Sequence, residues 1–317
     1  MLERFCCNAP LSPFQRRFVD QLLSTMIKTN SGIGLRRKFG LFAALGAALG
    51  AACTSSTPVE GTAIVAADYK NIPPQGTCAP GNKTGAAGPT NQLKSADGIF
   101  YHVRAPLNYN PERAHPLLMV FPPAGKNAEK SESFTHLTTE ATRRGFVIAH
   151  TSHRPISAEM AAKLAKVQQD IAATWCIDLK RVYATGHSDG GTMPHALAVL
   201  PETKGSISGI APSAAGFRQK DFEAYSCPAP MPVMIMHNQG DALFPGWGKE
   251  SAAWWAACNR CDMTQSAVPL NNGCVAYQGC AVSGPTVYCE KSGSHMDWQD
   301  RGDDIVHFFE LAAQRPN

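Results

Sequence analysis

One short stretch, residues 181–193 (RVYATGHSDGGTM), constrains this chain more than any other. The run from Val182 to Thr185 is apolar and rich in β-branched residues, which predicts a buried strand. It leads into Gly-His-Ser-Asp-Gly at residues 186–190, then a further glycine and a helix-compatible segment that ends at Leu200. Glycines on both sides of a serine allow a strand to turn sharply into a helix with the serine at the apex. Ser188 is therefore the first candidate for a nucleophile.

Strand and helix signals alternate along the rest of the chain. Apolar runs bounded by Pro or Gly predict strands at residues 99–104 (an edge strand), 117–121, 146–150, 182–185, 206–211, 232–237 and 286–289. Helix-compatible segments lie between them at 127–144, 157–175 and 192–200, and a last helix has Ile305 and Phe309 on its apolar face. This order predicts a single-domain α/β-hydrolase fold, in which helices cover both faces of a mainly parallel sheet.

A serine hydroxyl needs a general base, and the base needs a carboxylate to orient it. In this fold the chain order is serine, acid, histidine. His295 follows the strand-like residues 286–289 in a short polar loop, and Asp241 leaves the strand at 232–237 by a turn. Loops at the carboxyl ends of strands carry the chemistry of such sheets. We therefore expect Ser188, Asp241 and His295 to act together, with Asp297 as a poorer alternative for the acid.

The negative oxygen formed in acyl transfer needs two backbone N–H donors. One comes from the residue after the nucleophile, Asp189, and the other from the loop after an earlier strand. That loop begins Pro122-Pro123-Ala124-Gly125. Because proline has no N–H, Ala124 or Gly125 is the expected second donor.

The amino-terminal part of the chain reads as a leader. A basic cluster, a short apolar run and Ala-Ala-Cys at residues 36–53 predict a signal peptide, with Cys53 in a context similar to a bacterial lipoprotein processing site. The long segment before it suggests that translation begins at Met26. Residues 54–98, rich in Pro, Gly, Ser and Thr, predict a low-complexity tether, and residues 99–317 the catalytic domain. We expect an exported protein, either attached to the bacterial cell envelope through a lipid on Cys53 or extracellular.

Charge and cysteines support export. The leader, residues 1–53, carries +5 of charge and the rest of the chain −1, so nothing in the body suggests a basic surface and nucleic acid is not an expected partner. Eight of the 11 cysteines follow Cys53, which favours up to four disulfides in an oxidising compartment. The alternative is a zinc or redox site at Cys258 and Cys261, whose spacing is CxxC.

Six ordered blocks resemble the esterase and poly(3-hydroxybutyrate) depolymerase family, which also contains feruloyl and acetylxylan esterases. They are APLNYNPERAHPLLMVF, RRGFVIAH, CIDLKRVYATGHSDGG, CPAPMPVMIMHNQGD, WWAACNRC and GPTVYCEKSGSHMDW. The resemblance implies the triad roles for Ser188, Asp241 and His295, places Ala124 at the oxyanion donor position, and implies a disulfide between Cys261 and Cys280. The chain departs from the family in the oxyanion loop and in the residues beside its acid and base. The resemblance therefore does not imply which of the family's esters is the substrate.

These observations predict an exported serine carboxylesterase that needs no metal or organic cofactor. Its substrates would be polyhydroxyalkanoate oligomers or acyl and feruloyl esters of polysaccharides. Three other functions stay open: a peptidase on the same scaffold, a non-catalytic surface lipoprotein that binds a glycan or polymer, and a cysteine-metal protein.

Overall fold

The structure is a computed structural model that describes residues 59–72 and 76–313. The predicted leader, with Met26 and Cys53, lies outside these residues. Among the described residues, one ten-stranded sheet has the order β1-β2-β4-β3-β5-β6-β7-β10-β9-β8. The strands are β1 (Gly88–Lys94), β2 (Phe100–Ala105), β3 (His115–Phe121), β4 (Val147–Thr151), β5 (Ile177–His187), β6 (Gly209–Ser213), β7 (Val233–Gly240), β8 (Val268–Pro269), β9 (Cys274–Ala276) and β10 (Thr286–Ser294).

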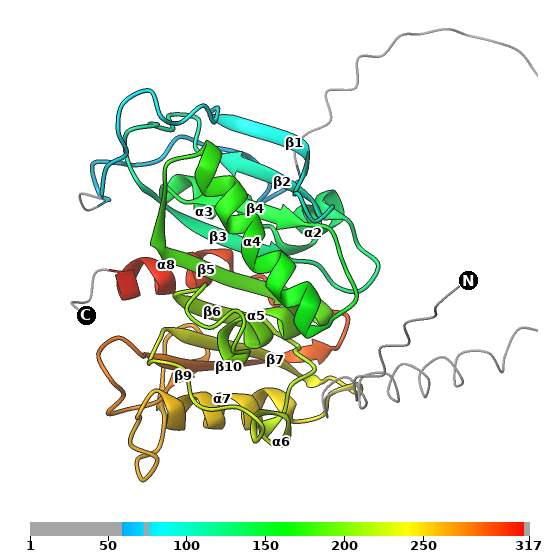
Figure 1. Cartoon of the computed structure of the whole chain (residues 1–317). Coiled ribbons are helices and arrows are strands. Elements are labelled where there is room, and N and C mark those ends of the chain that lie inside the picture. The colour runs from blue at the N-terminus through cyan, green and yellow to red at the C-terminus, as the bar shows by residue number, and fades with distance from the viewer. Residues whose placement is uncertain (1–58, 73–75, 314–317) are drawn as a thin grey trace, which may run out of the picture. The chain divides into compact units, whose positions relative to one another are not determined.

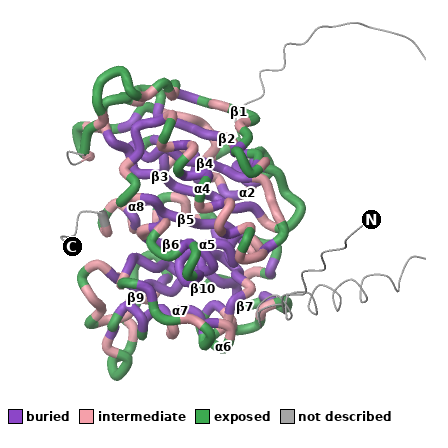
Figure 2. Tube along the Cα trace, in the orientation of Figure 1, coloured by how far each residue is buried: buried purple, intermediate pink, exposed green. Residues whose placement is uncertain are grey.

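The central strands β4, β3, β5, β6, β7 and β10 pair in parallel, and β1, β2, β8 and β9 pair antiparallel at the two sides. Every residue of β3, β4 and β6 is buried, as expected of parallel strands covered on both faces. The predicted α/β fold with a mainly parallel sheet is thus confirmed. Figure 2 shows the buried residues concentrated in these strands and in the helix that follows β5.

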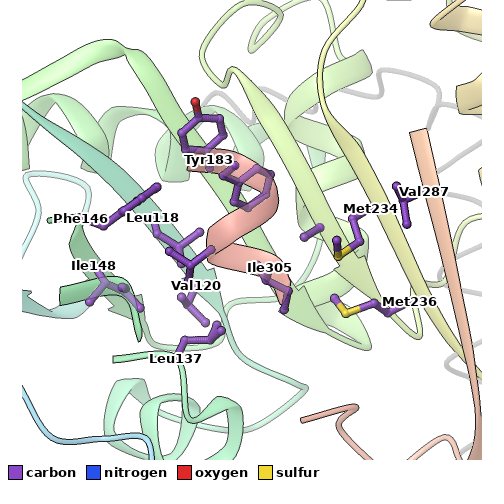
Figure 3. Close-up of a cluster of buried hydrophobic side chains, with 14 of the residues drawn as sticks. Leu118, Val120, Leu137, Phe146, Ile148, Tyr183, Met234, Met236, Val287 and Ile305 are labelled. Carbon is purple, nitrogen blue, oxygen red and sulfur yellow. The ribbon is translucent and has the colours of Figure 1, made fainter. Parts of the chain in front are cut away.

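The helices are α2 (Ala128–Thr135), α3 (Thr138–Arg143), α4 (Ala158–Thr174), α5 (Asp189–Val199), α6 (Gln219–Phe222), α7 (Trp247–Cys258) and α8 (Gly302–Ala313) (Figure 1). The helical segment expected at 127–144 is two helices, because His136 has a left-handed backbone (φ 53°) that ends α2. Leu118 and Val120 of β3 pack on the face covered by α3 and α8, in a cluster with Phe146, Tyr183 and Ile305 (Figure 3). Helices α4, α5 and α7 cover the other face.

The segment predicted as a tether is part of the folded domain where the structure describes it. β1 lies within it and pairs with β2, so β2 is not the edge strand that its sequence predicts. Cys78 forms a disulfide with Cys176, and the N–H of Gly85 donates to the carbonyl oxygen of Thr174 at 2.9 Å. The prediction was wrong because backbone hydrogen bonds and a disulfide hold this segment, and neither leaves a hydrophobic periodicity in the sequence.

Candidate functional site

The turn between β5 and α5 has the backbone that the glycine pattern predicts. Ser188 occupies a strained conformation, φ 58° and ψ −119°, between the last residue of the strand and the first of the helix. A Cβ on Gly190 would lie 2.0 Å from the carbonyl oxygen of Phe121, and one on Gly191 would lie 2.2 Å from that of Ser213. Only glycine therefore allows α5 to start this close to the ends of β3 and β6, which is what raises the serine above the sheet edge.

Three side chains from three strand ends form a continuous hydrogen-bonded series. The distance from Ser188 Oγ to His295 Nε2 is 2.8 Å, and from His295 Nδ1 to Asp241 Oδ2 it is also 2.8 Å. Ser188 follows β5, Asp241 follows β7 and His295 follows β10. Because β5, β6, β7 and β10 are parallel neighbours, their carboxyl ends meet at one edge, although Ser188 and His295 are 107 residues apart.

Asp241 is buried, with 2% of its surface exposed, and its two oxygens have different partners. Oδ1 accepts the backbone N–H groups of Leu243 and Phe244, both at 2.9 Å, and Oδ2 faces His295. Burial raises the pKa of Asp241, but the hydrogen bonds from His295 and from Phe244 outweigh it and hold the pKa below its ordinary value. The carboxylate is thus ionised at neutral pH, so His295 Nδ1 carries a proton and Nε2 is free to accept one from the serine hydroxyl.

Of the two expected oxyanion donors, Asp189 directly follows the serine, and the loop that contains Ala124 starts near it. Phe121 at the end of β3 pairs with Gly186, so the loop that contains Ala124 starts next to the turn. Asp189 is the first residue of α5, where its N–H has no acceptor one turn earlier in the helix. Asp189 also lines a pocket with Phe121, Pro122, Thr151, Ser152, His153, Arg154, Ile156, Leu164, Gly190 and Met193. Ala124 is exposed and is not among these lining residues.

Two histidines of the site were not found from the sequence. His153 Nε2 lies 3.0 Å from Asp189 Oδ2, and His187, beside the serine, contacts the backbone of His295. The position of His153 just after a predicted strand was a usable signal, since strand ends gather at one edge. The sequence offers no comparable signal for His187, because its role depends on a loop far along the chain. Asp297, the alternative acid, accepts from the N–H and hydroxyl of Ser294 within its own loop.

The eight cysteines that follow Cys53 form four disulfides: Cys78–Cys176, Cys227–Cys258, Cys261–Cys280 and Cys274–Cys289. The pair implied by the family resemblance is among them. Both cysteines of the CxxC are therefore in disulfides, each with a different partner. Across residues 59–72 and 76–313, no helix has the length and apolar character needed to cross a bilayer.

Comparisons with known proteins agree with this geometry. No protein-family model matches the chain. Feruloyl esterase B of Piromyces equi is 25% identical in an alignment of 243 residues that covers 66% of this chain and 45% of that protein. The acetyl xylan esterase of Aspergillus awamori has a TM-score of 0.50 at 13% identity, with 69% of this chain and 97% of that one covered. The chain has an α/β-hydrolase fold and is similar to these esterases.

A second solved structure supports the same fold. The chain matches the feruloyl esterase module of Clostridium thermocellum, solved with sinapinate, at a TM-score of 0.52 and 11% identity over 74% of this chain and 93% of that one. Identities this low show the fold alone. The chain also spans about half the length of the curated relative it matches, 45%. The comparisons thus agree with the predicted resemblance to feruloyl and acetyl xylan esterases, and the depolymerase part stays a prediction.

Proposed function

We propose that this α/β-hydrolase is a serine carboxylesterase that acts on acetyl or feruloyl esters of polysaccharides. The observation that carries the proposal is the series of 2.8 Å hydrogen bonds from Ser188 through His295 to a buried, ionised Asp241. The relatives named as feruloyl and acetyl xylan esterases support the substrate class.

In the proposed reaction, the hydroxyl of Ser188 attacks the ester carbonyl while its proton passes to Nε2 of His295. Asp241 keeps the imidazole in the correct tautomer and stabilises its positive charge. The backbone N–H groups of Asp189 and Ala124 stabilise the negative oxygen of the tetrahedral intermediate. Collapse of that intermediate breaks the ester bond, and the alcohol leaves with the proton from His295. Water then attacks the acyl-enzyme by the same path in reverse and releases the acid.

We also propose that the protein is exported. Four disulfides support this, because such bonds persist in oxidising compartments. Attachment to a membrane through a lipid on Cys53 is part of the proposal, and mass spectrometry of the mature amino terminus tests it.

The test of function is hydrolysis of 4-nitrophenyl acetate, methyl ferulate and a 3-hydroxybutyrate oligomer by the full chain, produced where disulfides form. Ser188→Ala should lower hydrolysis to background, whereas Ser133→Ala, at an exposed serine on α2, should leave it unchanged. The preferred ester separates the substrate classes, and a matched 4-nitroanilide distinguishes an esterase from a peptidase. Equal background rates in the wild type and Ser188→Ala on all of these esters would contradict the proposal.

A further inference from the structure

His187 is a buried histidine beside the nucleophile that the proposed reaction does not use. It is the last residue of β5, and 2% of its surface is exposed. Both of its ring nitrogens have partners. Nε2 lies 2.6 Å from the backbone carbonyl oxygen of His295, and Nδ1 lies 3.0 Å from the hydroxyl of Ser213. The side chain thus connects the serine turn with the loop that carries the base, 108 residues away.

The partners determine where the protons lie. A carbonyl oxygen can only accept a hydrogen bond, so Nε2 of His187 carries a proton and donates it to His295. Burial lowers the pKa of His187 to about 4, more than the hydrogen bond to His295 raises it, so the ring is neutral near pH 7. Nδ1 then has a lone pair and accepts from the hydroxyl of Ser213. The ring therefore acts as a single directed donor toward the base loop.

Ser213 extends this connection to the nucleophile itself. Its carbonyl oxygen accepts the backbone N–H of Ser188 at 3.0 Å, while its hydroxyl donates to His187. The end of β6 thereby holds both the serine turn and the ring that reaches the base loop.

The base loop is also held on either side of His295. Asn238 Nδ2 donates to the carbonyl oxygens of Ser294 and Asp297, on either side of it, at 2.9 and 2.7 Å. Met296, the next residue, is 73% exposed. The contact from His187 is made at the carbonyl oxygen of the base residue itself, and it comes from the strand that leads to Ser188. The ring of His187 is kept in place by Phe134, in edge contact at 5.2 Å between centroids.

We propose that His187 is a positioning residue that holds the backbone of His295, and so sets the distance between the serine hydroxyl and the imidazole. The inference rests on the proposed esterase function. A rotation or shift of the His295 backbone would lengthen the 2.8 Å contact between Nε2 and the serine hydroxyl. Misplacement of a reacting group by about 1 Å costs about 100-fold in rate, so the loss should appear in kcat rather than in KM.

The test uses two substitutions of the same length. Glutamine can donate a hydrogen bond to His295, and methionine cannot. His187→Met should lower kcat for 4-nitrophenyl acetate by about 10- to 100-fold with KM changed less than about threefold, and His187→Gln should recover most of that loss. Ser133→Ala, at the exposed serine on α2, leaves both the donor and its packing intact, so its kcat should stay within about threefold of the wild type. Thermal unfolding of each variant reports whether it is folded.

A second measurement does not depend on activity. In the wild-type protein with ¹⁵N-labelled histidine, nuclear magnetic resonance should find the proton of His187 on Nε2, in slow exchange with solvent at pH 7. A proton on Nδ1, or kcat of folded His187→Met within twofold of the wild type, would overturn the positioning role. If Met and Gln variants lose kcat equally, the donor is not the cause and the inference also fails. If the wild type hydrolyses no ester, the proposed function fails, and the resonance measurement still decides whether His187 holds the base loop.

Discussion

Replacement of Asp241 by asparagine tests the catalytic series most directly, because the structure determines how the new amide must lie. Oδ1 of Asp241 accepts two backbone N–H groups, from Leu243 and Phe244. An asparagine keeps those bonds only if its oxygen takes the Oδ1 position, and its NH₂ then faces Nδ1 of His295. Two donors cannot face each other, so His295 must change tautomer and carry its proton on Nε2.

This tautomer cannot accept the proton of Ser188, because Nε2 now donates instead. Loss of the correct tautomer in such a series lowers kcat by about 10⁴-fold. That factor corresponds to about 5.4 kcal/mol of transition-state stabilisation. The substitution removes no volume, keeps the two bonds from Leu243 and Phe244 and reverses the direction of the third, so we expect the thermal unfolding temperature to change by only a few degrees.

The assay is steady-state hydrolysis of the best ester found for the wild type, with circular dichroism to verify folding. Asp297→Asn is the matched control, since that carboxylate lies in the base loop but bonds only to Ser294. Its kcat should remain within about tenfold of the wild type, which is less than the roughly 100-fold loss of rate that a 1 Å misplacement of a reacting group causes. A folded Asp241→Asn protein with kcat within tenfold of the wild type would refute the assignment of Asp241 as the orienting acid.

Three further predictions concern stability. Cys78→Ser opens the disulfide that spans 98 residues of sequence and should lower the free energy of unfolding by about 2 to 5 kcal/mol in urea titrations; an unchanged midpoint would contradict it. Arg104→Met leaves the buried carboxylate of Glu132 without its ion pair and should cost about 3 to 5 kcal/mol, whereas the double variant with Glu132→Gln should recover part of this in the same titration. Burial lowers the pKa of His150, His187 and His195 in the folded state to about 4, 4 and 3. As pH falls below about 6.5, the unfolded chain therefore binds protons that the folded protein does not. The free energy of unfolding should therefore decrease between about pH 6.5 and 4, by up to about 1.4 kcal/mol per pH unit for each of these histidines. A free energy of unfolding that stays constant from pH 7 to 5 would be inconsistent with this.

Several features of the site could be predicted because their signals are local. The strand and glycine pattern around Ser188 predicts the turn, because a positive φ and a close backbone approach each depend on the identity of a single residue. The order of serine, acid and histidine, together with the position of Asp241 and His295 after strands, was enough to select the three side chains that the structure brings together. The parallel arrangement followed from apolar runs that are buried on both faces.

Other features could not be predicted because they depend on which strands are neighbours. The contact between the Asp189 carboxylate and His153 is an example. It forms because β4 and β5 both pair with β3, which brings the ends of these two strands close together. His195 of α5 is a second example, since it is buried and accepts the indole N–H of Trp255 of α7 at 2.9 Å.

The sequence alone determined the turn at Ser188, the α/β class of the fold and the three side chains of the hydrogen-bonded series, because each follows from patterns within single strands and loops and from their order in the chain. The tertiary structure decided the packing of residues 59–72 and 76–98 against the domain, the pairing of eight cysteines and the contact of His187 with the base loop. The physical reason is that these contacts join groups up to about a hundred residues apart, and sheet order and register, rather than local pattern, bring such groups within hydrogen-bonding distance.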